Sequence, residues 1–216
     1  LRWFGAKFGL ENTFKLAALA GNPQNQLRFV HVAGTNGKGS TCAMLESIYR
    51  AAGLRVGLFT SPHLVSFRER IQVNRQLISE ADVARLVAEL RRTGVAPVSN
   101  INTPQREPAD EDRRDACPTF FEFVTVMALR YFAEQKCDLV IWETGLGGRL
   151  DATNIVTPLA SVITNIQFDH ENWLGQSLDR IASEKAGIIK RGVPVLTAAE
   201  NEEALAIIRE TAQRHD

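Results

Sequence analysis

A glycine-rich stretch near the start of the sequence has the residue types that bind polyphosphates. Residues 31–41 read HVAGTNGKGST, with three glycines around Lys38 and two hydroxyl residues at the end. Glycines let backbone amides turn inward, a following helix offers its positive N-terminus, and the lysine adds a cation. The stretch departs from the usual Walker A pattern, because Val32 replaces the first glycine and Gly39 replaces the hydroxyl residue. The alternative is a glycine-rich turn with a solvent-exposed lysine.

Two polar residues that follow apolar stretches offer ligands for a cation. Glu143 ends the stretch DLVIWE, and His170 follows the next apolar stretch, in NIQFDHENWLG. A carboxylate beside a phosphate loop suits Mg²⁺, a hard cation that prefers oxygen ligands. Each residue also has a simpler interpretation, because Glu143 could cap a loop and a lone histidine is more often a packing residue. The two residues by themselves leave these alternatives open.

The elements that must position these residues alternate between strand and helix. Strands are expected at 27–33, 55–61, 138–143, 159–166 and 194–197, and helices at 38–52, 79–92, 120–134, 178–190 and the C-terminal end. Because apolar strands of this kind belong to a sheet covered on both faces, we predict an α/β three-layer sandwich. Its sheet should be mainly parallel and P-loop NTPase-like, with ligands at the carboxyl ends of the strands.

Two further segments refine this organisation. The stretches ERIQVN and QLI flank Arg75 and predict a hairpin, and Ser79 with Asp82 resembles a capping box that opens the helix to Arg92. Residues 93–118 are rich in Pro, Asn and mixed charge without apolar periodicity, so we expect a long mobile loop. Loops of this length in compact domains are usually lids, binding loops or insertions.

Composition excludes several classes of protein. The 216 residues contain 25 basic and 25 acidic side chains, so their charge favours neither nucleic acid nor an anionic membrane as a partner. No apolar run approaches the ~18 residues of a membrane span. Cys42, Cys117 and Cys137 are odd in number and widely spaced, which disfavours a disulfide framework or a thiolate zinc site. We expect a cytoplasmic monomer that binds small molecules.

Several motifs together resemble a known family. GTNGKGS, TSPHL with FRERI, ETGLGGRLDATN, the DH pair and EKAGIIKRGVPV occur in this order in folylpolyglutamate and dihydrofolate synthases, members of the Mur-ligase superfamily. The resemblance covers residues 30–195 and implies that the first motif binds the phosphates of ATP through its backbone and Lys38. The implied ATP-binding residues are Gly34, Thr35, Asn36, Gly37, Lys38, Gly39, Ser40 and Thr41.

The resemblance also implies ligands for two Mg²⁺ ions. The Ser61 hydroxyl and the Glu143 carboxylate would bind one ion, and Glu143, His170 and Lys185 would bind the other. Lys185 would be carboxylated by CO₂, because an ammonium cannot ligate a cation whereas a carbamate offers two anionic oxygens. Without the resemblance, Lys185 looks like an ordinary helix lysine. Lys38, Lys185 and His170 are the implied catalytic residues.

The implied reaction joins L-glutamate to dihydropteroate, to reduced folates or to both. A substrate carboxylate would take the γ-phosphoryl group of ATP to form an acyl phosphate, which the amine of L-glutamate then attacks. The pterin-like substrate would lie against Thr119 and Phe121 in PTFFEF and against Asp151 and Ala152 in GRLDATN. Phe121 could otherwise be ordinary helix core.

Two other functions remain open at this point. A cell-wall Mur ligase would share the phosphate loop, the metal ligands and the carbamate lysine, although TSPHLVSFRERI resembles the folate branch. A nucleotide-binding module without ligase activity is the second, because family members carry a further C-terminal domain. We therefore expect residues 1–216 to form an ATP-binding and folate-binding domain, with the glutamate-ligase domain absent from this chain.

Overall fold

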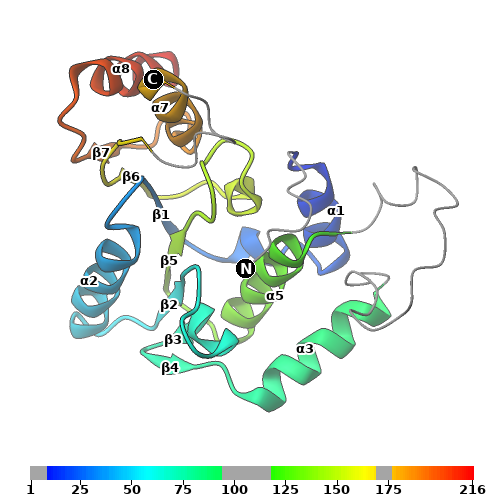
Figure 1. The fold of residues 1–216 in the computed structure, drawn as a ribbon. Helices are drawn as coiled ribbons and strands as arrows, with labels where there is room; N and C mark the ends of the chain where they lie inside the picture. Colours follow the sequence, from blue (N-terminus) through cyan, green and yellow to red (C-terminus); the bar gives the residue numbers. More distant parts are fainter. Residues whose placement is uncertain (1–8, 94–117, 169–176) are drawn as a thin grey trace, which may run out of the picture.

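A seven-stranded sheet forms the centre of the molecule (Figure 1). The computed structural model describes residues 9–93, 118–168 and 177–216. The strands, in the order in which they pair, are β4 (Gln76–Leu77), β3 (Ile71–Val73), β2 (Val56–Phe59), β5 (Leu139–Glu143), β1 (Phe29–Ala33), β6 (Ala160–Ile163) and β7 (Val195–Thr197). The five strands β2, β5, β1, β6 and β7 are parallel to one another. Strand β3 pairs antiparallel with β2 and with β4. The predicted mainly parallel sheet and the hairpin at Arg75 are confirmed.

Helices cover both faces of this sheet. Figure 1 shows α2 on one face, α1, α3 and α5 on the other, and α7 with α8 beside β6 and β7. Their bounds are α1 (Glu11–Leu19), α2 (Lys38–Ala51), α3 (Glu80–Arg92), α5 (Phe120–Glu134), α7 (Leu178–Ala186) and α8 (Glu202–Arg214). Three short 3₁₀ helices, η1 (Pro23–Gln26), η2 (Phe67–Arg70) and η3 (Ala152–Ile155), lie in the connections. The three-layer α/β sandwich is therefore confirmed.

Local sequence explains why the central elements form where they do. All five residues of β1 and of β5 are buried, as expected for strands covered on both faces. Helix α5 begins with a capping box between Thr119 and Glu122. Trp142 of β5 packs against Phe59 and Phe132, and each such side chain contributes about 1.5–3 kcal/mol by its burial.

The end of one helix differs from the prediction, and one predicted loop lies mostly outside the described residues. Helix α7 ends at Ala186 instead of continuing to residue 190. The chain turns there because Gly187 packs against Arg149, whose Cβ would lie 2.3 Å from a Cβ at position 187, and because the Gly187 carbonyl accepts a hydrogen bond from Asn154. The expected loop at 93–118 falls almost entirely outside the described residues. Within the described ranges, no helix is both long enough and apolar enough to cross a membrane.

Candidate functional site

The loop from Gly34 to Thr41 joins the carboxyl end of β1 to the start of α2, which is the context that a phosphate loop requires. Gly34 and Gly37 have φ angles of 147° and 80°, which non-glycine residues rarely adopt. A side chain at Gly34 would also overlap Thr164, because its Cβ would lie 1.8 Å from the Thr164 Oγ1. Since Lys38 begins α2, the loop amides lie at the positive end of that helix.

Residues directly after β6 hold this loop in place. The backbone amide of Asn36 donates to Asn165 Oδ1 at 2.8 Å, and its side-chain amide donates to Gln167 Oε1 at 2.9 Å. The Thr164 hydroxyl donates to the Asn36 carbonyl at 2.7 Å. The supporting role of Thr164, Asn165 and Gln167 was not predicted from the sequence. The three polar residues in TNIQ, directly after an apolar strand, are the signal that points to it.

Two lysines donate to the same carbonyl group of the phosphate loop. Lys38 Nζ donates to the carbonyl oxygens of Gly34 at 3.0 Å and Thr35 at 3.2 Å. Lys185 Nζ donates to the Gly34 carbonyl at 2.9 Å, and Lys185 is only 2% exposed. The fold therefore brings Lys185 to the phosphate loop. A carbamate on Lys185 stays a prediction.

Glu143 lies at the carboxyl end of β5, next to β1, and is 3% exposed. Its Oε2 accepts a hydrogen bond from the backbone amide of Ser61 at 2.9 Å, and no other donor to this carboxylate occurs among the described residues. Burial raises the pKa of Glu143 to about 7, although the Ser61 amide and the Lys38 charge oppose this rise. A buried carboxylate with one hydrogen-bond donor is well suited to binding a cation.

Asp151 lies in the loop that follows β5 and is held in a different way. Its Oδ2 accepts hydrogen bonds from the amides of Gly145 at 3.0 Å and Leu146 at 2.9 Å, and its Oδ1 accepts two from Thr153. Burial raises the pKa of Asp151, whereas these hydrogen bonds lower it. Ala152 begins η3 directly afterwards and is buried. In this structure the Asp151 carboxylate organises its own loop.

Phe121 packs against the loop that Asp151 organises. A Cβ at Gly145 would lie 2.6 Å from Phe121 Cζ and 3.0 Å from Asp151 Oδ2, so only glycine fits at this position. Thr119 caps the helix that carries Phe121, and its hydroxyl accepts from the Glu122 amide at 3.2 Å. Phe121 of α5 and Asp151 of the loop after β5 therefore both lie close to Gly145.

His170 lies outside the described residues, so its predicted role stays a prediction. Among the residues that the structure does describe, no three His, Cys, Asp or Glu side chains lie close enough together to hold a metal ion. The predicted Mg²⁺ ligands other than His170 include one carboxylate, from Glu143, together with the Ser61 hydroxyl and a modified Lys185. The predicted Mg²⁺ site therefore would not be a cluster of acidic side chains.

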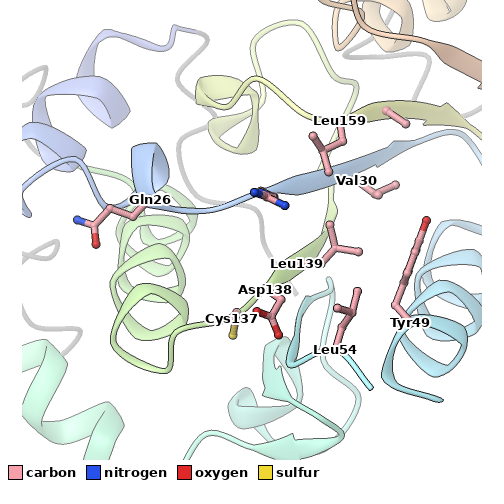
Figure 2. Close-up of a pocket in the computed structure, with 10 residues that line it drawn as sticks. Gln26, Val30, Tyr49, Leu54, Cys137, Asp138, Leu139 and Leu159 are labelled. Atoms are coloured by element: carbon pink, nitrogen blue, oxygen red, sulfur yellow. The ribbon is translucent and has the colours of Figure 1, made fainter. Parts of the chain in front are cut away.

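A hollow of about 630 Å³ lies at the opposite edge of the sheet (Figure 2). Its lining includes Arg28, Asp138 and Leu159, which directly precede β1, β5 and β6. Tyr49 of α2 also lines it. None of the predicted site residues contributes to it. The candidate site is therefore the carboxyl edge of the sheet, where the phosphate loop lies.

The sequence and the fold are similar to those of proteins from one family. A dihydrofolate synthase/folylpolyglutamate synthase from Bacillus subtilis is 47% identical over 213 residues, which is 98% of this chain and 46% of that protein. A solved FPGS–AMPPCP–folate complex has a TM-score of 0.86 at 35% identity, covering 99% of this chain and 49% of that one. E. coli FolC in complex with DHPP and ADP has a TM-score of 0.83 at 38% identity, covering 99% and 47%. No protein-family model matches the chain.

The sheet, its covering helices and the phosphate-loop motif together define an α/β fold of the Mur-ligase type. The chain belongs to the folylpolyglutamate and dihydrofolate synthase family, which confirms the resemblance that the motifs indicated. It spans about half the length of the relatives that it matches.

Proposed function

We propose that this chain is the ATP-binding and folate-binding part of a ligase that joins L-glutamate to dihydropteroate, to reduced folates or to both. The observation that supports this most is that two loops begin at the carboxyl ends of the paired parallel strands β1 and β5. One is the phosphate loop, and the other follows Glu143 and packs against Phe121. Solved relatives contain either AMPPCP with folate or DHPP with ADP, which supports the same pairing of ligands.

The phosphate loop would bind the triphosphate of ATP through its backbone amides and Lys38. The Lys38 ammonium already lies over the loop, on the carbonyls of Gly34 and Thr35. Its compact charge suits a phosphate oxygen, and phosphoryl transfer depends mainly on positioning and on such charge stabilisation.

Glu143 and Ser61 fit a Mg²⁺ ion, because Glu143 is a buried carboxylate with a single donor among the described residues. A second ion would need His170 and a carbamate on Lys185. Mg²⁺ bound in this way would neutralise charge on the transferring phosphoryl group.

The proposed reaction is an amide ligation in two steps. The substrate carboxylate attacks the γ-phosphorus of ATP, ADP leaves, and an acyl phosphate forms. The amine of L-glutamate then attacks the acyl carbon, and phosphate leaves. Thr119 and Phe121 from α5, with Asp151 and Ala152 from the loop, would hold the pterin end so that the carboxylate faces the γ-phosphate. Holding two reactants in this geometry removes much of the barrier to their reaction.

We propose further that residues 1–216 form one domain and that another domain supplies the glutamate site, because the matched relatives are about twice as long. The proposed protein is a cytoplasmic monomer. Its 25 basic and 25 acidic side chains balance, which fits small-molecule substrates and no nucleic-acid or membrane partner.

The proposal is tested with the complete gene product, ATP, L-glutamate and either dihydropteroate or a reduced folate, measuring ADP and the glutamylated product. We expect product with at least one of the two substrates. Lys38→Ala should lower turnover by about 10²–10³-fold. The exposed helix residue Lys15 provides the control, since Lys15→Ala should retain the wild-type rate.

Two results would favour another function. ATP binding without a glutamylated product from any pteroate would identify a nucleotide-binding module. Ligation restricted to cell-wall precursors would identify a Mur ligase of the cell-wall branch.

A further inference from the structure

Two neighbouring strand residues converge on one residue of the loop that follows β5. His31 of β1 and Trp142 of β5 are partners in the sheet register, and both are fully buried. His31 Nε2 lies 3.0 Å from the Thr153 hydroxyl, and the Trp142 indole N–H donates to the Thr153 carbonyl at 2.9 Å. Thr153, itself buried, is therefore held by two strands at once.

Thr153 in turn holds Asp151. Its backbone amide donates to Asp151 Oδ1 at 3.0 Å, and its hydroxyl donates to the same oxygen. The other oxygen accepts from the amides of Gly145 and Leu146. A carboxylate has about four acceptor positions, so Asp151 is saturated by these four donors. Asp151 thus acts on the loop backbone.

The direction of these hydrogen bonds defines the part played by His31. A threonine hydroxyl has one proton, which goes to Asp151, so it must accept from the Nε2–H of His31. His31 Nδ1 is then unprotonated, and it has no hydrogen-bond partner among the described residues. Burial lowers the pKa of His31 to about 3, so the ring is neutral near pH 7. An apolar residue would avoid the cost of this unpaired nitrogen, which indicates that the histidine does more than fill space.

We propose that His31 and Thr153 are positioning residues for the pterin end of the substrate, acting through Asp151 on the backbone of residues 144–147. This inference rests on the proposed function. The loop packs closely on Phe121, because a Cβ at Gly145 would lie 2.6 Å from the ring. A small displacement of the loop therefore alters the surface that the pterin would contact.

The same network should leave the ATP site unaffected. The phosphate loop is held by other contacts, from Thr164, Asn165 and Gln167. A defect confined to the pterin substrate is thus the signature of a positioning role, whereas general loosening of the fold would affect both substrates.

The test compares KM values for ATP and for the accepted pteroate substrate in the complete gene product. Thr153→Val replaces the hydroxyl by a methyl group of similar size, and Thr153→Ser retains a hydroxyl. Thr125→Val is the matched control, because Thr125 is a buried threonine of α5 whose hydroxyl has no partner among the described residues. Hydrogen exchange of the Gly145 and Leu146 amides, which donate to Asp151, provides a second readout.

We expect Thr153→Val and His31→Phe each to raise the pteroate KM about tenfold and to change the ATP KM less than about twofold. Combining them should add little to Thr153→Val alone, because both break the same network. Thr153→Ser and Thr125→Val should resemble wild type. The two amides should exchange faster in Thr153→Val and unchanged in Thr125→Val.

Equal rises in both KM values, or an unchanged pteroate KM, would overturn the proposal. If the wild-type protein glutamylates no pteroate, the proposed function fails, and amide exchange alone then decides on the network. Faster exchange in Thr153→Val would still support the positioning of the loop, whereas unchanged exchange would reject it.

Discussion

Glu143 and Asp151 are two buried carboxylates at the same edge of the sheet, and they differ in how the protein satisfies them. Glu143 is 3% exposed and accepts one hydrogen bond, from the Ser61 amide, among the described residues. Asp151 is 7% exposed and accepts four, from Gly145, Leu146 and Thr153. Burial raises the pKa of both groups.

This difference separates an organising carboxylate from an available one. Removing a saturated carboxylate leaves several buried donors unpaired, which lowers stability. Removing a carboxylate that accepts one hydrogen bond leaves only one donor unpaired. The main effect of that change should therefore be weaker binding of the group's ligand. Sequence types and spacing do not distinguish the two residues, but their hydrogen bonds do.

The largest expected effect is that of Glu143→Gln on catalysis. The amide keeps the size of the side chain but removes the charge proposed to bind Mg²⁺, so turnover should fall by about 10³-fold. Urea denaturation at pH 5, where the folded protein keeps the Glu143 carboxyl protonated, should change little. Glu46→Gln is the matched control, because Glu46 is a fully buried glutamate that pairs with Arg50 and Arg75. It should lose stability and keep its turnover. The comparison breaks down if Glu143→Gln unfolds the protein and spares catalysis.

The second effect is a pH dependence of stability without Mg²⁺. Because the pKa of Glu143 rises from 4.5 to about 7 on folding, the folded state binds more protons than the unfolded state between these values. Stability should therefore fall as pH rises through this window, by about 3 kcal/mol at 1.36 kcal/mol per pH unit. Urea denaturation at pH 5 and pH 8, compared with Glu143→Gln, isolates this contribution. Equal pH dependence in both proteins would contradict it.

A smaller effect is expected on stability when Asp151 loses its charge. Asp151→Asn places an amide NH₂ among four donors, so the free energy of unfolding should fall by about 2 kcal/mol. Asp138→Asn at the opposite edge provides the control. The exposed Asp138 carboxylate accepts one hydrogen bond, from the backbone amide of Arg55. If the free energy of unfolding fell equally in the two variants, the four hydrogen bonds to Asp151 would contribute no more to stability than the single one to Asp138.

The smallest effect is expected for Ser61→Ala. The contact of Ser61 with Glu143 uses the backbone amide, which alanine retains, so only the proposed hydroxyl ligand is lost. Turnover should fall only about three- to tenfold, the size of one neutral hydrogen bond. Titration of activity with Mg²⁺ should show a correspondingly higher metal requirement. A loss as large as that of Glu143→Gln would mean that the two residues act as one unit.

Periodicity was sufficient to predict most of the fold. The apolar stretches around Val30 and Ile141 have the length and β-branching of buried strands, and helix 120–134 was predicted with its observed bounds. The end of α7 was missed, because Gly187 stops the helix through contacts with Arg149 and Asn154, which are distant in sequence.

The candidate site was predictable where function concentrates in one motif, as in the glycine loop. It was not predictable where a residue acts through another. His31 looks like an interruption of an apolar strand, and Thr153 like one polar residue in a loop, until the fold places them in contact. The assignment of Asp151 to the substrate stays a prediction, although its four donors now suggest an indirect contribution.

The hydrogen bonds that hold the phosphate loop also affect when the loop can form during synthesis of the protein. Asn36 bonds to Asn165, which lies 129 positions further along the chain. At about 5–20 residues per second, a ribosome needs on the order of ten seconds to make the intervening segment. The loop therefore emerges long before these supports, and until β6 joins the sheet it lacks its hydrogen bonds with Thr164, Asn165 and Gln167. Nucleotide binding should begin late in translation, after the first half of the domain has been made.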